Sequence, residues 1–343
     1  MNTQNNVPKA AKPAAFDEAA FKETFDGLLS EGKAEPALTH LLNALPQLSA
    51  SKLNRKEKLK HLTFAGRMLQ GAGLGKYGPE KLRGKAANLA RMVKRHGLRS
   101  RRTFVDLGCG AHEPLAMATY FYANGFENAF GSDFMPISDE SYAALSMYDV
   151  ISSMFMFPER YMMEGTDQAD YLARLRNFDA AALSKGDLAG GLRNVAEQVA
   201  FKCCDIVEAG IAPGSVSFLI SYAVFEHVMD VPGVTKHIYE LMEPGGLGFH
   251  YIDLADHRAY RHDGDYNEFS FLTEETCAPN LNRLRASEQI AAFKAVGFEI
   301  LETQHKRIPV PETTRAAYLP RFAAMSEEDQ DSRALRLVIR KPV

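Results

Sequence analysis

A short apolar segment that runs into two glycines places the strongest constraint on what this chain can fold into. Residues 103–114 have the sequence TFVDLGCGAHEP, and the overlapping segment EPLAMATYFYANG continues to Gly125. The first residues favour a buried strand, the glycines a tight turn, and the later residues a helix. Because this order begins many nucleotide-binding sheets, the segment predicts a first strand followed by a ligand-binding loop.

Strand-like and helix-like segments alternate over the rest of the chain. The further strand candidates are NAFGSDF, FKCCDI, SVSFLISYAVF, GLGFHYIDL, FEILETQHKRIPV and RALRLVIRKPV. Between the fourth and fifth strands, VPGVTKHIYELMEPGG has the periodicity of a helix. Strands that alternate with helices predict an α/β fold built on a doubly wound parallel sheet.

The connection between the second and third strand candidates is unusually long. Nearly 70 residues separate Asp133 from Lys202, whereas a crossover needs only about a dozen. The segment contains MYDVISSMFMFPERYMMEG, which is rich in Met, Phe and Tyr. We predict an inserted helical lid at about residues 136–198, a candidate substrate-binding element, although packing against a core explains the same composition.

The chain before the glycine turn has a different character. Residues 1–14 are polar and lack the apolar core of a signal peptide, so we predict a disordered tail. Residues 15–98 have helical periodicity, and GPEKLRGKAANLARMVKRHG has good helix start and stop signals. We predict a helical N-terminal cap at 15–98 and a ligand-binding domain at 99–343. The cap could cover the site or form a homodimer interface, and the sequence leaves both open.

Composition and charge argue against several classes of partner. The formal net charge of −3 provides no field that would attract nucleic acid. No apolar segment approaches the roughly 20 residues needed to span a bilayer. The four cysteines have no CxxC spacing, which argues against structural zinc and suits a reducing compartment. We therefore expect a cytoplasmic protein that acts on a small molecule, without nucleic acid or membrane.

The glycine turn departs from the dinucleotide fingerprint GxGxxG at its third glycine. Gly108 and Gly110 are present, but Glu113 occupies the third place. A carboxylate beside a pyrophosphate would be repulsive, which disfavours an NAD-dependent oxidoreductase. S-adenosylmethionine suits the turn better, because it has no phosphate and carries a cationic sulfonium and an amino-acid tail.

Three acids add to this interpretation. Asp133 ends the second strand candidate, 23 positions after Gly110, close to the roughly 20 residues at which an acid binds ribose hydroxyls. Asp205 ends the third candidate, where a carboxylate could meet the adenine amino group. Asp106 lies inside the turn and could order the loop by accepting backbone N–H bonds.

The order of these motifs resembles the class I S-adenosylmethionine-dependent methyltransferases over roughly residues 103–308, leaving out the lid. The segments FLISYAVFEHVMD and LMEPGGLGFHYIDL continue the resemblance. It implies a Rossmann-like seven-stranded sheet with two antiparallel strands at one edge, and S-adenosylmethionine as cofactor, with S-adenosylhomocysteine as the product. The cofactor-binding residues assigned on this basis are Asp106, Gly108, Cys109, Gly110, Asp133, Phe134, Asp205, Ile206, Ser221 and Tyr222.

The sequence departs from this family's pattern at two places. The family more often has small residues where His112 and Glu113 stand. It also often has an acid on the fourth strand, near Ser217 or Ser221. The second departure leaves the group nearest the methionine end of the cofactor unassigned, although Ser221 or Tyr222 could serve.

Two clusters of polar residues follow the fourth and fifth strand candidates, where ligands bind in such sheets. The first is Glu226 and His227, and the second contains Asp253, Asp256, His257, Arg258 and His262. An alcohol acceptor must lose a proton, and histidine suits that task near neutral pH.

We assign His227, His257 and Asp253 as candidate catalytic residues, with Asp253 or Asp256 able to orient His257. Loop hydrogen bonds, capping and salt bridges explain the same residues equally well. The acids and histidines could also ligate a divalent cation, but their spacing has no tight signature and we assign no metal.

The segments DLADHR, FLTEE, NRLRASEQ and GFEI are similar to those of bacterial methyltransferases of glycan and secondary-metabolite pathways. The resemblance implies a methyltransferase of class EC 2.1.1 that methylates the oxygen of a small polar acceptor, such as a sugar or secondary-metabolite hydroxyl. Two alternatives remain open. One is N- or C-methylation of a small molecule, and the other is a catalytically silent regulatory module that binds S-adenosylmethionine.

Overall fold

The computed structural model describes two long stretches of the chain and several short ones. They are residues 17–30, 36, 40, 44, 79–260, 266–276 and 280–343. The predicted tail at 1–14, most of the predicted cap at 15–98 and the candidate residue His262 therefore lie outside the described residues. The described parts of the cap include the helices α1 (Glu18–Ser30) and α4 (Pro79–His96).

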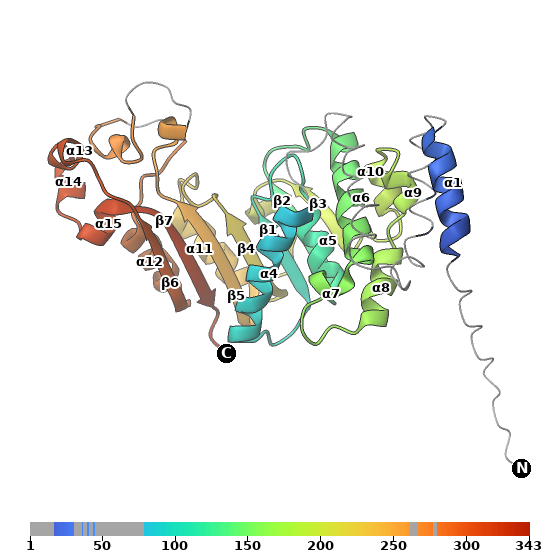
Figure 1. The fold of residues 1–343 in the computed structure, drawn as a ribbon. Coiled ribbons are helices and arrows are strands. Elements are labelled where there is room, and N and C mark those ends of the chain that lie inside the picture. Colours follow the sequence, from blue (N-terminus) through green and yellow to red (C-terminus); the bar gives the residue numbers. More distant parts are fainter. Residues whose placement is uncertain are drawn as a thin grey trace, which may run out of the picture.

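A seven-stranded sheet organises the structure, with the strand order β3-β2-β1-β4-β5-β7-β6 (Figure 1). The first five strands are parallel, and β7 lies antiparallel between β5 and β6. The strands are β1 (Thr103–Leu107), β2 (Asn128–Asp133), β3 (Val199–Cys203), β4 (Val216–Tyr222), β5 (Met242–Asp253), β6 (Glu299–Arg307) and β7 (Ser332–Arg340). This confirms the predicted Rossmann-like sheet of seven strands with an antiparallel edge.

Burial explains why the central strands β1 and β4 are mostly apolar and show no alternation of apolar and polar residues. Every residue of β1 is buried, as is every residue of β4 up to Ser221. Strands covered on both faces lose the alternation of apolar and polar residues that half-exposed strands show. The edge strand β6 has no buried residue and is correspondingly rich in charge.

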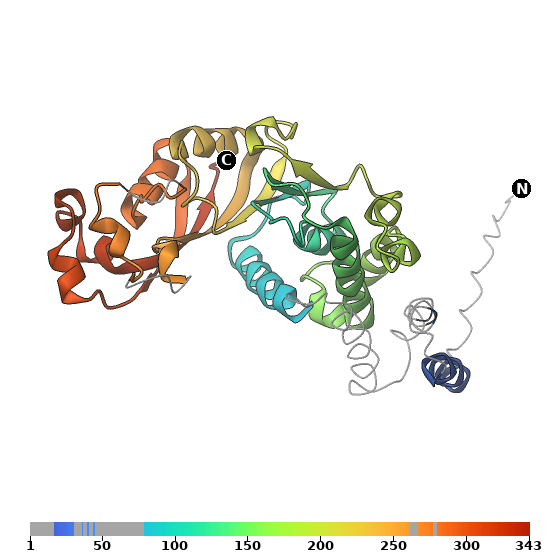
Figure 2. The same cartoon turned by 90° about the horizontal axis from the view of Figure 1, so that it is seen from above.

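Different helices cover the two faces of the sheet. Phe104 and Phe218 belong to one apolar cluster, which includes residues of α4 and α5 (Ala116–Ala123). Val105 and Leu219 belong to a second cluster, with residues of α11 (Val231–Leu241) and α12 (Ala286–Ala295). Figure 2 shows α4, in cyan, on one side of the sheet and helices of the C-terminal half on the other. The sheet is therefore doubly wound, as predicted.

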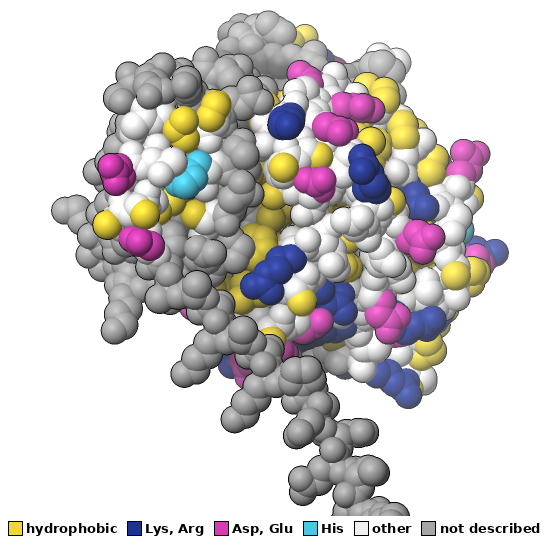
Figure 3. Space-filling model, turned by 90° about the vertical axis from the view of Figure 1, so that its right-hand side faces the viewer, with side chains coloured by type: hydrophobic (Ala, Val, Ile, Leu, Met, Phe, Trp, Pro, Cys, Tyr) yellow, Lys and Arg dark blue, Asp and Glu magenta, His cyan; other side chains and the backbone are white. Residues whose placement is uncertain are grey.

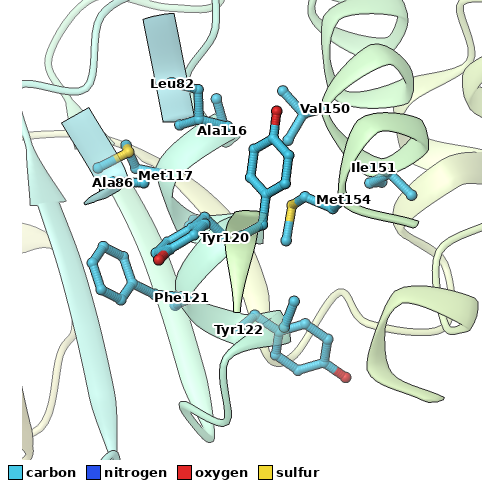
Figure 4. Packing of buried hydrophobic residues seen from close by; sticks show 14 of the residues in the cluster. Leu82, Ala86, Ala116, Met117, Tyr120, Phe121, Tyr122, Val150, Ile151 and Met154 are labelled. Atoms are coloured by element: carbon cyan, nitrogen blue, oxygen red, sulfur yellow. The ribbon is translucent and has the colours of Figure 1, made fainter. Parts of the chain in front are cut away.

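The long connection between β2 and β3 is helical and contributes to the core. Its helices are α6 (Glu140–Met156), α7 (Pro158–Tyr161), α8 (Gln168–Arg176), α9 (Ala180–Leu183) and α10 (Leu188–Leu192). Val150, Ile151 and Met154 of α6 lie on the Tyr120 side of α5, whereas Met117 of α5 lies next to Ala86 of α4 (Figure 4). The apolar stripe of this segment therefore serves packing, and its closure over a ligand stays a prediction.

The chain between β5 and β7 forms a smaller apolar cluster of its own. This region contains η2 (His257–Tyr260), η3 (Ser270–Leu272), α13 (Glu312–Ala316), α14 (Pro320–Ala323) and α15 (Glu327–Asp331). The fully buried guanidinium of Arg285 donates to the carbonyl oxygens of Leu254, Asp329 and Ser332. One side chain thus satisfies three buried backbone acceptors and joins these segments to the sheet.

Positive and negative side chains are interspersed on the face shown in Figure 3. On that face, the described Lys and Arg side chains do not gather into a stripe of the kind that follows a nucleic-acid backbone. Among the described helices, none is both long enough and apolar enough to cross a membrane.

Candidate functional site

Two cavities adjoin the glycine turn at the point where the strand order reverses, between β1 and β4. Open α/β sheets bind ligands at this point. The larger cavity, of about 730 Å³, is lined by Asp133, Asp205 and His227 among others. The smaller, of about 310 Å³, is lined by Lys85, Asp106, Glu113 and Tyr222 among others. Gly108, Gly110 and Ala111 line both cavities, so the turn is their common wall.

The two glycines of the turn are required for different reasons. Both have positive φ angles, +66° at Gly108 and +86° at Gly110, which favour glycine. A Cβ atom at Gly108 would also lie 2.2 Å from Cγ2 of Val224, whereas one at Gly110 would meet open space. On β2, a Cβ atom at Gly131 would lie 2.2 Å from the carbonyl oxygen of Pro114. A glycine inside a strand often marks such a close approach, but our sequence analysis did not single out Gly131.

Asp133 is held rigidly at the end of β2. Its Oδ2 accepts a hydrogen bond of 2.9 Å from the backbone N–H of Gly110, and its Oδ1 accepts one of 2.9 Å from that of Met135. Each carboxylate oxygen retains a further lone pair. The side chain is therefore placed to accept hydrogen bonds from a ligand in the larger cavity.

The far side of the larger cavity combines one acid with apolar groups. Asp205 caps η1 (Ile206–Glu208) by accepting the backbone N–H of Val207 at 3.0 Å, and buried Ile206 lines the cavity. At the rim, Phe134, Met135 and Met229 are 76%, 51% and 60% exposed. Large exposed apolar side chains around a cavity are typical of a binding surface. Met135 and Met229 had no signal in the sequence.

The smaller cavity carries groups of both charges. Burial raises the pKa of Asp106 to about 7, against the lowering effect of Lys85, and Asp133 raises it further. Glu113 accepts a hydrogen bond of 2.7 Å from Ser146 Oγ. The Lys85 ammonium, from α4, lies 4.4 Å from the centroid of the Tyr222 ring. No sequence pattern pointed to Lys85, since α4 precedes the glycine turn in the chain and reaches the cavity only through tertiary packing.

The remaining predicted cofactor residues differ in position. Cys109 lines the smaller cavity, and burial raises the pKa of its thiol. Ser221 is fully buried, and its hydroxyl lies 2.8 Å from Nδ1 of His250, whose pKa burial lowers to about 3. Because neighbouring strand residues point to opposite faces, only Tyr222 of the pair Ser221–Tyr222 lines the smaller cavity.

A third hollow, of about 490 Å³, shares Lys85 and Tyr222 with the smaller cavity. Arg91, Arg95 and Arg336 line it, together with polar groups of β6. Apart from Tyr222, the predicted site residues do not line this hollow.

The candidate catalytic residues converge at the ends of β4 and β5. Ligand atoms of Glu226, His227 and His257 all lie within 4.8 Å of one another. The His227 and His257 ring centroids are 5.1 Å apart, and His227 Nδ1 lies 2.6 Å from the carbonyl oxygen of Asn280. Burial raises the pKa of the Glu226 carboxyl to about 8, and Asp253 adds to this effect. The sequence pattern indicated Glu226 only as the neighbour of His227.

The two nearby aspartates are engaged with other residues. Asp253 accepts the Tyr260 hydroxyl at 2.7 Å and 3.0 Å, and the backbone N–H of Ala255 at 3.2 Å. Asp256 forms a salt bridge of 2.6 Å with Arg258. The orientation of His257 by either carboxylate stays a prediction.

A family model described as a methyltransferase domain matches residues 77–303, about two thirds of the chain. No curated protein matches the chain.

Three solved structures show how distant the similar folds are. The geranyl diphosphate C-methyltransferase from Streptomyces coelicolor A3(2) has 12% identity and a TM-score of 0.41, covering 74% of this chain and 77% of that one. An S-adenosylmethionine-dependent methyltransferase from Mesorhizobium loti has 14% identity and a TM-score of 0.39, covering 76% and 99%. The [4+2]-cyclase SpnF has 15% identity and a TM-score of 0.39, covering 75% and 80%. The substrates and reactions in these names belong to those three proteins.

The different surroundings of the two turn glycines lead to a stability prediction. Gly110→Ala incurs only the positive-φ penalty, about 1 to 2 kcal/mol. Gly108→Ala adds the collision with Val224 and should lower the free energy of unfolding by about 2 kcal/mol more. Urea denaturation measures both. Adding Val224→Ala to Gly108→Ala should recover part of this difference, and equal losses in the two single variants would contradict the packing argument.

Proposed function

The chain belongs to the methyltransferase domain family and uses S-adenosylmethionine, and we propose that it methylates a hydroxyl oxygen of a small polar acceptor, such as a sugar or secondary metabolite. The observation that carries the proposal is the pair of imidazoles, His227 and His257, at the edge of the sheet where the ligand cavities lie. An acceptor hydroxyl must lose its proton as the new C–O bond forms.

The cofactor fits the two cavities on grounds of charge and shape. In the larger cavity, Asp133 would bind the ribose hydroxyls and Asp205 the adenine amino group. Phe134 and Ile206 would offer apolar surface to the adenine ring. The close packing of Gly108 on Val224 leaves no space for a side chain at this wall. When bound, the cofactor supplies an electrophilic methyl group on a sulfonium.

The smaller cavity suits the zwitterionic tail of the cofactor. Asp106 and Glu113 would receive its ammonium group, and Lys85 its carboxylate. This arrangement gives a role to the acid at Glu113, which disfavours a pyrophosphate at the same turn. It also supports a ligand that carries both charges.

The two histidines would bind the acceptor hydroxyl and promote loss of its proton. The carbonyl oxygen of Asn280 can only accept, so His227 Nδ1 must be the donor in their contact. Nε2 of His227 is then the unprotonated nitrogen in the neutral ring. Asp253, engaged by Tyr260, would act through its negative charge and by fixing the loop after β5.

Calorimetric titration tests the cofactor assignment. S-adenosylmethionine and S-adenosylhomocysteine should bind the wild-type protein, and NAD should not. Asp133→Ala should weaken binding of both ligands by about 10- to 100-fold, because it removes charge-assisted hydrogen bonds. Asp167→Ala, a helix-cap variant outside both cavities, should bind normally. Equal affinities in wild type and Asp133→Ala would refute the assignment.

The raised pKa of Asp106 predicts two opposite pH dependences. The folded-state pKa of about 7 exceeds the ordinary 3.8, so this group stabilises the apoprotein when protonated. That stability is complete below about pH 4 and is lost as the pH rises through 7. Cofactor affinity should instead rise about tenfold between pH 6 and 8, as the carboxylate forms to receive the ammonium.

Asp106→Asn isolates the contribution of Asp106 to these pH dependences. Other groups titrate in the same range, such as Asp149, whose pKa burial raises to about 7. The variant should reduce both pH dependences, measured by urea denaturation and calorimetry. Unchanged pH profiles would contradict the assignment of Asp106.

An acceptor screen tests the site of methylation. Release of S-adenosylhomocysteine is measured with a panel of sugars and hydroxylated metabolites, and with amines for comparison. For a hydroxyl acceptor, His227→Gln and His257→Gln should each lower kcat by about 100-fold, the usual scale of proton-transfer catalysis. The affinity for S-adenosylmethionine should not change. His237→Gln, on α11 and outside both cavities and the cluster, should retain turnover. Full turnover in both cluster variants would favour N- or C-methylation.

A further inference from the structure

The loops after β4 and β5 bring together three side chains with the chemistry of metal ligands. Glu226 and His227 follow β4, and His257 begins η2 after β5. The carboxylate oxygen and the two imidazole nitrogens involved all lie within 4.8 Å of one another. Because β4 and β5 are adjacent and parallel, their carboxyl ends meet at one edge of the sheet and direct both loops to the same place.

Glu226 is the member of this cluster whose surroundings most require a bound partner. Its side chain is only 4% exposed, and neither carboxylate oxygen has a hydrogen-bond partner among the described residues. The backbone N–H groups of Glu226 and Asp253 lie near enough to influence it, but neither makes a hydrogen bond of ordinary geometry. A buried carboxylate without a partner is strongly unfavourable in its ionised form. A bound cation would supply that partner.

His227 has the orientation that metal-binding imidazoles usually show. Its Nδ1–H donates to the Asn280 carbonyl oxygen at 2.6 Å, which leaves Nε2 with a free lone pair. Ligating histidines characteristically donate their other nitrogen to a carbonyl or carboxylate in this way. The ring is exposed and also lines the larger cavity, so a cation here would be accessible from solvent and from the ligand site.

We propose that Glu226, His227 and His257 bind a divalent first-row transition cation, such as Zn²⁺, Mn²⁺ or Fe²⁺, at the edge of the methyl-transfer site. Two imidazoles and one carboxylate suit these cations, whereas Mg²⁺ and Ca²⁺ prefer ligand sets made of oxygen. Donor atoms around such a cation lie about 3 to 3.5 Å apart. Since the present separations are at most 4.8 Å, the ligands would have to close in by no more than about 1.5 Å. Three protein ligands leave coordination positions open for a substrate oxygen.

The role of the cation rests on the proposed O-methylation. With the cation bound, the two histidines would promote loss of the acceptor proton as metal ligands and not by direct contact with the hydroxyl. Coordination of the hydroxyl would lower its pKa, so that its proton passes to solvent. The acceptor oxygen then forms a bond to the methyl carbon as the bond from that carbon to sulfur breaks. The electron pair of the broken bond stays on sulfur, and the cation keeps its oxidation state throughout.

Metal titration of the purified, EDTA-treated full chain tests the site without any acceptor. Co²⁺ serves as the probe, because its visible absorption reports imidazole and carboxylate ligation, and Zn²⁺ is added as competitor. We expect one Co²⁺ per chain, displaced by Zn²⁺. Glu226→Gln should weaken Co²⁺ binding by at least 100-fold, and His112→Gln, which removes an exposed imidazole outside the cluster, should leave it unchanged.

His257→Gln provides a second test, because its half-exposed side chain is less critical to folding than buried Glu226. It should weaken Co²⁺ binding to a similar extent, with unchanged thermal unfolding and S-adenosylmethionine affinity. Absence of Co²⁺ binding to the wild-type protein, or equal binding by His257→Gln, would overturn the metal site.

The same preparation separates failure of the metal site from failure of the proposed function. Full turnover of a hydroxyl acceptor in EDTA would overturn the metal's role and leave O-methylation standing. Stoichiometric Co²⁺ binding that Glu226→Gln and His257→Gln abolish, together with methylation of amines only, would support the metal site and refute O-methylation.

Discussion

Both ligand cavities depend on how closely the loop after β1 approaches its neighbours. That approach is possible because Gly108 and Gly131 lack side chains. A Cβ atom at the first would collide with Val224, and one at the second with the carbonyl oxygen of Pro114. The loop also donates a backbone N–H to Asp133, so the same approach fixes the orientation of that carboxylate. The positions of the polar groups thus follow from packing of backbone on its neighbours, before any ligand is bound.

The parts of the site that the sequence predicted are those encoded locally. Gly108 and Gly110 come just after β1, Asp133 ends β2 and Asp205 follows β3, so chain order alone places them at one edge of a parallel sheet. The central strands β1 and β4 were predictable because their largely apolar runs are bounded by turn residues, whereas the antiparallel pairing of charged β6 with β7 was predicted from the family resemblance. The limits of the strands were less accurate, since β3 begins at Val199, two residues before the predicted segment FKCCDI.

The remaining features arise from tertiary approach, which sequence spacing does not encode. Lys85 reaches the smaller cavity only because α4 packs against the sheet beside Tyr222. Glu226 and His257 are 31 positions apart, and their proximity depends on the register of β4 and β5. The choice between Ser221 and Tyr222 likewise required knowing which face of β4 each residue occupies. The residue types of the site were thus predictable, but which of these side chains lie together was not.

The helical insertion between β2 and β3 also bears on the order in which the molecule assembles. Pairing these strands closes a connection from Asp133 to Val199, whereas β4 and β5 are joined through a single helix. Contacts between segments distant in sequence form slowly, because closing a long loop is entropically unfavourable. We therefore expect β3 to join the sheet only after α6–α10 have formed, a delay that pulse-labelled hydrogen exchange would detect. Asp205 follows β3, so the adenine side of the larger cavity would be the last part of the site to exist during folding.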